Sequence, residues 1–302
     1  MHDIIVIGAG PAGLTAALYA LRADKSVLVL EKATFGGQIT FSPQIENYPG
    51  FASMSGNEFA DKLVDQVINQ GADIEMETVT GIRDNGDTKT VVTEDGEHEA
   101  KAVIIATGVK HRQTGLPNEN ELVGGGISYC AVCDGAFFKG QTVAVLGGGN
   151  SALQEAVLLS DGCEKVYVIQ NLDYFTGEAR LVEKLKEKDN VEFIMGTVIS
   201  SLNGEGSLES LTLRKEADGS ESELRVNGLF VAIGLIPNNK MFEEIAGLDE
   251  WGYIDSDESC LTKTEGVFVA GDCRKKQIRQ ITTAAADGSV AALAACRYID
   301  SK

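Results

Sequence analysis

The chain has 302 residues, a length typical of about two domains, and its 43% hydrophobic content is sufficient for two buried cores. Its formal net charge of −19 argues against nucleic acid or an anionic membrane surface as a partner. No apolar run is long enough to span a membrane, and a charged residue, Asp3, near the start argues against a signal peptide. We therefore expect a cytoplasmic protein.

The chain opens with the pattern of a strand, a glycine turn, a helix and a second strand. Gly8, Gly10 and Gly13 fill the positions of G-x-G-x-x-G, which provide a tight turn, backbone access to a pyrophosphate and close helix packing. The helix is expected to begin near Pro11, with its positive end directed at the phosphates. Glu31 ends the second strand, where a carboxylate accepts hydrogen bonds from ribose hydroxyls. These residues predict a dinucleotide-binding domain.

The same pattern occurs again later in the chain, where Gly147, Gly149 and Ala152 fit G-x-G-x-x-A. The position that corresponds to Glu31 is Gln170, and no arginine for an NADP phosphate follows it directly. Two such units predict two nucleotide-binding folds built on parallel sheets. The second fold either binds a nucleotide weakly or serves mainly as a scaffold.

Two cysteines, Cys130 and Cys133, are separated by two residues shortly before the second unit. At this spacing one helical turn lets them form and break a disulfide, and a helix N-terminus there would favour the thiolate. Asp134 follows and is close enough to donate or accept a proton. Half of a zinc site and a structural cysteine pair are the other interpretations, but the chain offers no second pair of metal ligands, so we predict no metal. The remaining cysteines are expected to pack in the core or at the surface, and they are Cys163, Cys260, Cys273 and Cys296.

Several short motifs occur in one order along nearly the whole chain. They are Gly8–Gly13, Gly36-Gly37-Gln38, residues 46–50, Ala106-Thr107-Gly108, residues 129–134, residues 147–150 and Gly271-Asp272 through Arg279-Gln280. In this order they resemble the low-molecular-weight thioredoxin reductases. The resemblance implies an α/β fold with two Rossmann-like nucleotide-binding domains of the FAD/NAD(P) type, the second inserted into the first. It places the FAD domain at residues 1–114 and 245–302, and the dithiol domain with a degenerate pyridine-nucleotide site at 115–244.

By this resemblance the protein passes electrons from FAD through the dithiol to thioredoxin. Cys133 would face the flavin, Cys130 would attack the thioredoxin disulfide, and Asp134 would be the acid–base group. The family also implies a homodimer and a rotation of the inserted domain between flavin and thioredoxin. The residues implied to bind FAD are Gly8, Gly10, Pro11, Ala12, Gly13, Glu31, Gly37, Gln38, Asn47, Ala106, Gly108, Gly271, Asp272, Arg279 and Gln280.

The chain departs from the NADPH-using members of this family after the second strand of the second unit. Those members carry His-Arg-Arg and then a further Arg, at positions that are here Gln170, Asn171, Leu172 and Thr176. Losing two or three charge-assisted hydrogen bonds would weaken NADPH binding at least ~100-fold. Arg180 could compensate only if the loop folds differently. The departure resembles the ferredoxin-dependent flavin thioredoxin reductases, so we expect ferredoxin as the electron donor.

A cluster of cations close in sequence to Asp272 is the expected docking patch for ferredoxin, although a solvated turn or contacts to FAD phosphates would use the same residues. The cluster contains Arg274, Lys275, Lys276 and Arg279, extended by Lys110 and Arg112. Tyr174 is a candidate to fill the vacated nucleotide pocket.

Three other functions remain open: an NADPH- or NADH-dependent reductase with a reshaped pocket, a flavin dithiol oxidase, and a non-catalytic redox-sensing or binding module that only holds FAD.

Overall fold

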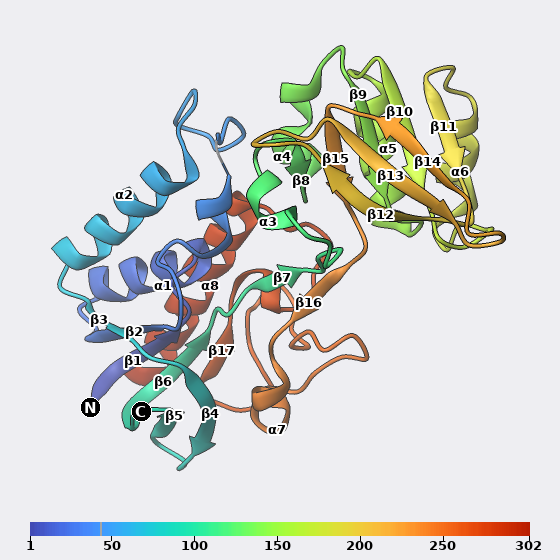
Figure 1. Ribbon diagram of the computed structural model, residues 1–302. Helices are drawn as coiled ribbons and strands as arrows, with labels where there is room; N and C mark the ends of the chain where they lie inside the picture. Colours follow the sequence, from blue (N-terminus) through green and yellow to red (C-terminus); the bar gives the residue numbers. More distant parts are fainter. Residues whose placement is uncertain (43) are drawn as a thin grey trace. The chain divides into compact units, whose positions relative to one another are not determined.

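The computed structural model describes residues 1–42 and 44–302, and it has the predicted α/β fold with Rossmann-like sheets. Two compact units can be distinguished, and each is described separately below (Figure 1). Unit 1 contains Met1–Lys110 and Ile236–Lys302, and unit 2 contains His111–Leu235. The chain crosses between the units in β7 (Val109–His111) and β16 (Leu235–Pro237), which form a two-stranded sheet.

Unit 1 is built on a seven-stranded sheet with the order β3-β2-β1-β6-β5-β4, in which β17 pairs with the second half of β6. The strands β3, β2, β1, β6 and β17 are parallel, whereas β5 and β4 continue the sheet in antiparallel pairing. The bounds are β1 His2–Ile7, β2 Val27–Glu31, β3 Asp73–Met76, β4 Val79–Asp84, β5 Lys89–Thr93, β6 Glu97–Ile105 and β17 Val267–Val269.

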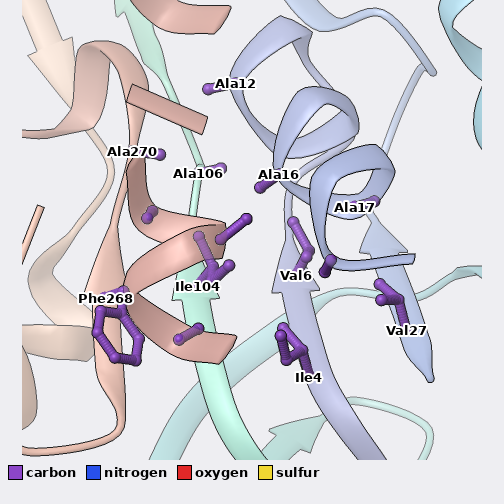
Figure 2. Packing of buried hydrophobic residues seen from close by; sticks show 14 of the residues in the cluster. Ile4, Val6, Ala12, Ala16, Ala17, Val27, Ile104, Ala106, Phe268 and Ala270 are labelled. Carbon is purple, nitrogen blue, oxygen red and sulfur yellow. The ribbon is translucent and has the colours of Figure 1, made fainter. Parts of the chain in front are cut away.

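The central strands of this sheet are apolar on both faces because they are covered on both sides. On one face, the alternate residues Ile4 and Val6 of β1 pack with Ile104 of β6 against the small side chains of α1, including Ala16 (Figure 2). On the other face, Ile5 packs against a separate cluster that includes residues of α7. The helices of unit 1 are α1 Pro11–Arg22, α2 Gly56–Asn69, α7 Glu243–Ala246 and α8 Ile281–Asp300, with 3-10 turns η1 Gly37–Phe41, η3 Lys240–Phe242 and η4 Gly271–Cys273.

Unit 2 contains a parallel five-stranded sheet with the order β11-β10-β9-β15-β8. Alternate residues of β9 point to opposite faces: Val143 and Val145 pack against α5, and Ala144 packs against the antiparallel sheet β12-β13-β14. The strands are β8 Ile127–Ser128, β9 Thr142–Leu146, β10 Lys165–Ile169, β11 Val191–Ile194, β12 Thr197–Asn203, β13 Ser210–Lys215, β14 Glu221–Arg225 and β15 Gly228–Val231. The helical elements are α3 Glu119–Leu122, α4 Ala131–Asp134, η2 Gly135–Phe138, α5 Asn150–Ser160 and α6 Ala179–Lys186.

The predicted internal repeat is confirmed, because β1-α1-β2 in unit 1 and β9-α5-β10 in unit 2 have the same parallel pairing. α1 begins at Pro11 as predicted. Proline has no backbone N–H, but the N–H groups of the first helical turn have no partner within the helix, and the φ angle of proline is the one that a helix requires. Across the described ranges of the chain, no helix combines the length and the apolar character that a membrane crossing would need.

Candidate active site

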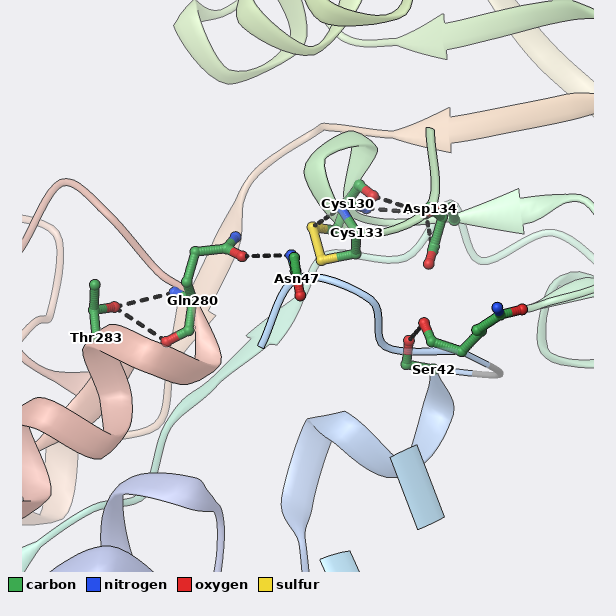
Figure 3. The surroundings of a disulfide bond; sticks show 9 residues. Ser42, Asn47, Cys130, Cys133, Asp134, Gln280 and Thr283 are labelled. Carbon is green, nitrogen blue, oxygen red and sulfur yellow. Dashed lines mark hydrogen bonds between the residues drawn. A yellow bond between two sulfur atoms is a disulfide. The ribbon is translucent and has the colours of Figure 1, made fainter. Parts of the chain in front are cut away.

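The two cysteines of the Cys-x-x-Cys motif form a disulfide in unit 2 (Figure 3). Their Cα atoms are 5.3 Å apart. Cys130 is the N-cap of α4, and its Sγ accepts a hydrogen bond from the backbone N–H of Cys133 at 3.2 Å. The same N–H would stabilise negative charge on Cys130 Sγ once the disulfide is reduced. The local fold therefore favours a thiolate at Cys130.

Asp134 is connected to Cys130 through the hydroxyl group of Ser128. Ser128 Oγ donates to Asp134 Oδ2 at 2.6 Å and accepts from the Cys130 backbone N–H at 3.1 Å. The other carboxyl oxygen of Asp134, Oδ1, is buried and has no hydrogen-bond partner among the described residues. Burial raises the pKa of Asp134 above its usual range. The side chain can therefore hold a proton beside the cysteines.

A second carboxyl group fixes the segment that leads into the dithiol. Glu119 is buried, and it accepts hydrogen bonds from the Tyr129 hydroxyl at 2.8 Å and from the Thr114 hydroxyl and backbone N–H at 2.8 and 3.0 Å. The Tyr129 ring also stacks on His111, with 5.1 Å between centroids. Neither Glu119 nor Ser128 was among the predicted site residues, because a single serine or glutamate outside a motif carries no signal in the sequence.

The first glycine turn in unit 1 has the shape that a pyrophosphate requires. At Gly8, a Cβ atom would lie 2.4 Å from the Ala106 carbonyl oxygen, so the turn is closed on that side. At Gly10, a Cβ atom would meet nothing closer than the Gly36 carbonyl oxygen at 4.0 Å, so this backbone is open to an incoming group. The helix α1 starts directly after it, with Pro11, Ala12 and Gly13 in its first turn.

Glu31 holds this turn in place from the end of β2. Its Oε2 accepts from the Ala9 backbone N–H at 2.8 Å, and its Oε1 accepts from the backbone N–H groups of Lys32 and Ala33 at 2.9 Å. An ionised carboxylate has about four lone-pair sites, so acceptor capacity remains for a ribose hydroxyl. Glu31 therefore also stabilises the glycine turn through its own hydrogen bonds, a role that the motif alone does not predict.

Other predicted FAD residues come together within unit 1. Asn47 Nδ2 donates to Gln280 Oε1 at 3.2 Å, which joins a loop to the N-cap of α8 (Figure 3). Gln38 Nε2 donates to the Val109 carbonyl oxygen at 2.5 Å, in the strand that follows Gly108.

Asp272 lies in η4, directly after Gly271. Its Oδ1 is buried without a partner among the residues that the structure describes, and burial raises its pKa to about 6. Arg279 lies nearby: its guanidinium covers the Tyr253 ring at 4.3 Å, and its Nε donates to the Asp272 carbonyl oxygen at 3.4 Å. A buried oxygen that lacks a donor fits a hydroxyl group of a bound flavin nucleotide.

The structure contradicts the prediction for two of the six cations in the patch. Arg274 has only 2% of its side chain exposed and bonds to Asp287 of α8 at 2.9 Å, and Lys276, at 5%, bonds to the same carboxylate at 2.9 Å. Asp287 Oδ2 also accepts from the Gly271 backbone N–H at 3.0 Å. These cations therefore support the turn that carries Asp272 instead of facing a partner.

Lys275 is 62% exposed and pairs with Asp255 at 3.3 Å. Lys110 belongs to unit 1 and Arg112 to unit 2.

Replacing Asp287 with asparagine is expected to destabilise the protein by about 3–5 kcal/mol, because two buried cations lose their anion. The free energy of unfolding in urea, followed by circular dichroism, measures this loss. The control is Glu258→Gln, since Glu258 is 90% exposed and contacts the same Arg274 at 3.0 Å. It should cost less than about 1 kcal/mol. Equal losses in the two variants would contradict the role of Asp287.

The second glycine turn is contacted by its own chain at Gly148, while Gly149, the counterpart of Gly10, stays open, since a Cβ atom there would meet nothing closer than Thr176 Oγ1 at 3.8 Å. Gln170 is buried over Gly148, where a Cβ atom would lie 2.3 Å from the Gln170 Nε2. The Gly148 carbonyl oxygen accepts hydrogen bonds from the Thr176 and Gly177 backbone N–H groups at 2.9 and 3.0 Å, and from the Thr176 hydroxyl at 3.2 Å. The loop after β10 is thereby bound to the turn that a nucleotide would approach.

The one cation in this loop is paired with a neighbouring acid. Arg180 is the one basic residue between positions 170 and 180, and its Nε bonds to Glu178 Oε2 at 2.6 Å. Glu178 is itself fixed, because its backbone N–H donates to Asn150 Oδ1 at 2.7 Å. Tyr174, the candidate to fill this site, is 59% exposed, and its carbonyl oxygen accepts a hydrogen bond from Gln170 Nε2 at 3.3 Å.

The four cysteines outside the motif are all buried, which decides between the core and surface positions left open by the sequence. Cys273 lies next to Asp272, but its Sγ faces the Ala270 carbonyl oxygen at 3.3 Å, as expected for a packing residue.

Comparison with known proteins agrees with this geometry. Residues 2–288 match the family described as pyridine nucleotide-disulphide oxidoreductase. The chain is 40% identical to the thioredoxin reductase of Bacillus subtilis (99% of this chain, 95% of the relative) and to a 34.2 kDa protein in the rubredoxin operon of Clostridium pasteurianum (99% and 98%). It superposes on the crystal structure of thioredoxin reductase from Streptococcus pyogenes with a TM-score of 0.96, at 38% identity over 100% of this chain and 99% of the other. The chain therefore belongs to the pyridine nucleotide-disulphide oxidoreductase family, and within it is an FAD-dependent oxidoreductase related to the thioredoxin reductases.

Proposed function

We propose that this protein reduces the disulfide of thioredoxin with electrons that pass from FAD to the Cys130–Cys133 pair. The observation that carries the proposal is the disulfide itself, with Cys130 Sγ bonded to a backbone N–H and connected through Ser128 to a proton-holding carboxyl group. The relatives named thioredoxin reductase match nearly the whole chain.

The residues of unit 1 fit FAD. The open backbone at Gly10 and the start of α1 would hold the pyrophosphate, and Glu31 would accept from a ribose hydroxyl. Asp272 would use its unpartnered oxygen, while Gln38 and the Asn47–Gln280 pair would line the flavin, with Gly37, Ala106, Gly108, Gly271 and Arg279 completing the site. When bound, FAD supplies a two-electron store that can reduce a neighbouring disulfide.

The chain's own residues then perform the exchange. Reduction by two electrons breaks the Cys130–Cys133 disulfide. The Cys130 sulfur becomes a stabilised thiolate, and the Cys133 sulfur becomes a thiol or a thiolate. Cys130 attacks one sulfur of the thioredoxin disulfide, and the sulfur that leaves takes a proton from Asp134. Cys133 then attacks Cys130 in the mixed disulfide, which re-forms the internal disulfide and releases thioredoxin with two thiols.

We further propose that the electron donor is a ferredoxin and that the second glycine turn no longer binds a pyridine nucleotide. Gln170 stands where a ribose-binding acid would be and packs against Gly148, and the one basic residue of the loop that should supply arginines, Arg180, is paired with Glu178. The relative described as a protein in a rubredoxin operon is consistent with an electron-transfer protein as donor. Because Arg274 and Lys276 are buried and Lys275 is paired, we do not propose this cluster as the docking surface.

The family resemblance supports three additional proposals about organisation. We propose that unit 1 is the FAD domain, that unit 2 is the dithiol domain, and that the protein is a homodimer whose dithiol domain rotates between flavin and thioredoxin.

The thioredoxin step can be tested separately from the donor. The flavoprotein is reduced anaerobically by light in the presence of a deazaflavin, without excess reductant, and oxidised thioredoxin is then added. Thioredoxin thiols should appear in proportion to the electrons stored, and the flavin absorbance should recover. Failure of the reduced protein to transfer electrons to thioredoxin would reject the proposed activity.

A further inference from the structure

A carboxyl group from α5 faces the dithiol segment. Leu159 of α5 packs on the residues after the dithiol, since its Cδ2 lies 3.1 Å from where a Cβ on Gly135 would be. Glu155 is one helical turn before Leu159, and residues four apart share one face of a helix. α5 also packs on α4, the helical turn that begins directly after Cys130.

Glu155 and Asp134 both lack a partner for one oxygen. Oε2 of Glu155 and Oδ1 of Asp134 are buried and accept no hydrogen bond from any residue in the described ranges. Burial raises the pKa of Glu155 to about 7, and the neighbouring charge of Asp134 raises it as well. Besides α4 and η2, the elements packed most closely on α5 are α6, β9 and β10, and within the described part of the chain only the charge of Asp134 acts on Glu155.

Two carboxyl groups in one apolar environment cannot both ionise without cost. The backbone N–H of Ala131, which favours the ionised form of Glu155, is in the helical turn that holds Cys130 and Asp134. A charge at Glu155 therefore acts on the same groups that gain and lose protons during disulfide exchange. The glycine motif of the second unit does not indicate a role for Glu155, because this residue lies beyond the last position of the motif, Ala152.

We propose that Glu155 is a positioning residue for the dithiol, whose charge controls how readily Cys130 becomes a thiolate and Asp134 releases its proton. When Glu155 is protonated it adds no charge, and a thiolate at Cys130 is opposed only by Asp134. When Glu155 is ionised, its negative charge opposes the thiolate and keeps the proton on Asp134. The inference rests on the proposed function only in taking the dithiol as the reacting group.

The test is the rate at which iodoacetamide alkylates Cys130 as a function of pH, in the flavin-loaded Cys133→Ser protein with and without Glu155→Gln. The four other cysteines are buried, so Cys130 gives the fast phase. With Glu155 present, the rate should rise over a broader pH range than a single ionisation gives. With Glu155→Gln, we expect a single ionisation and a rate about threefold to tenfold higher above a pH of about 8.

Two further variants make the result decisive. Glu183→Gln removes an exposed acid on α6 that pairs with Lys186, and it should leave the profile unchanged. Glu155→Asp keeps a titrating group at the site, so the broad profile should return. If Glu155→Gln and its parent have the same rates at every pH, or if Glu183→Gln changes them equally, the proposal is wrong. Because neither donor nor thioredoxin is present, failure of the proposed function would leave this profile intact.

Discussion

Cys130→Ser is expected to lower thioredoxin reduction by about 1,000-fold or more, while FAD stays bound and its spectrum is retained. The hydroxyl group of serine is not ionised near neutral pH and forms no mixed disulfide, so the step that transfers electrons out of the protein is lost. The FAD residues proposed in unit 1 are not touched by this change, because Cys130 belongs to unit 2. Turnover with photoreduced protein and oxidised thioredoxin measures the effect.

Cys163→Ala is the matched control, because Cys163 is a lone buried cysteine in the same unit. It should keep turnover within about twofold of the parent, since it provides no reacting sulfur. Cys133→Ser should trap a mixed disulfide between Cys130 and thioredoxin. If Cys130→Ser kept more than about a tenth of the activity, the dithiol would not be the route, as the non-catalytic FAD-holding module predicts.

Rebuilding the arginines after β10 is expected to create NADPH binding. The variant combines Gln170→His, Asn171→Arg, Leu172→Arg and Thr176→Arg. Asn171 and Thr176 are exposed and Leu172 is half-buried, so these three changes cost little packing, while the change at Gln170 alters the group that covers Gly148. Two or three new charge-assisted hydrogen bonds to the 2′-phosphate should tighten NADPH binding at least ~100-fold.

The affinity for NADH is the internal control for this variant. NADH lacks the 2′-phosphate, so its dissociation constant should change far less than that of NADPH. Quenching of the protein's fluorescence during titration with each nucleotide gives both constants. Tight NADPH binding by the unaltered protein, or equal gains for the two nucleotides, would show that the loop does not control recognition.

The short motifs of the sequence correctly predicted those turns, helix starts and strand ends that depend on residues close to one another in the chain. The glycine turn before Pro11 and the strand that ends at Glu31 depend on neighbouring residues, and both lie where the motif places them. The Cys-x-x-Cys spacing likewise predicted a disulfide at a helix start, because Cys130 and Cys133 are one turn apart.

Contacts between distant segments could not be predicted in this way. Arg274 and Lys276 are charged residues in a turn, which is typical of a surface, and only the fold shows that Asp287 of α8 buries them. Ser128 contacts the dithiol segment from a separate strand, and Glu155 lies on α5, which packs on that segment, with no motif to indicate either.

Anaerobic reduction of the flavin by different donors tests the central claim most directly. The visible flavin absorbance is followed while NADPH, NADH and reduced ferredoxin are added in separate experiments, each continued with oxidised thioredoxin. We expect ferredoxin alone to bleach the flavin, and thioredoxin thiols to follow. Rapid bleaching by NADPH or NADH would contradict the account, because it would show that the loop after Gln170 still admits a pyridine nucleotide.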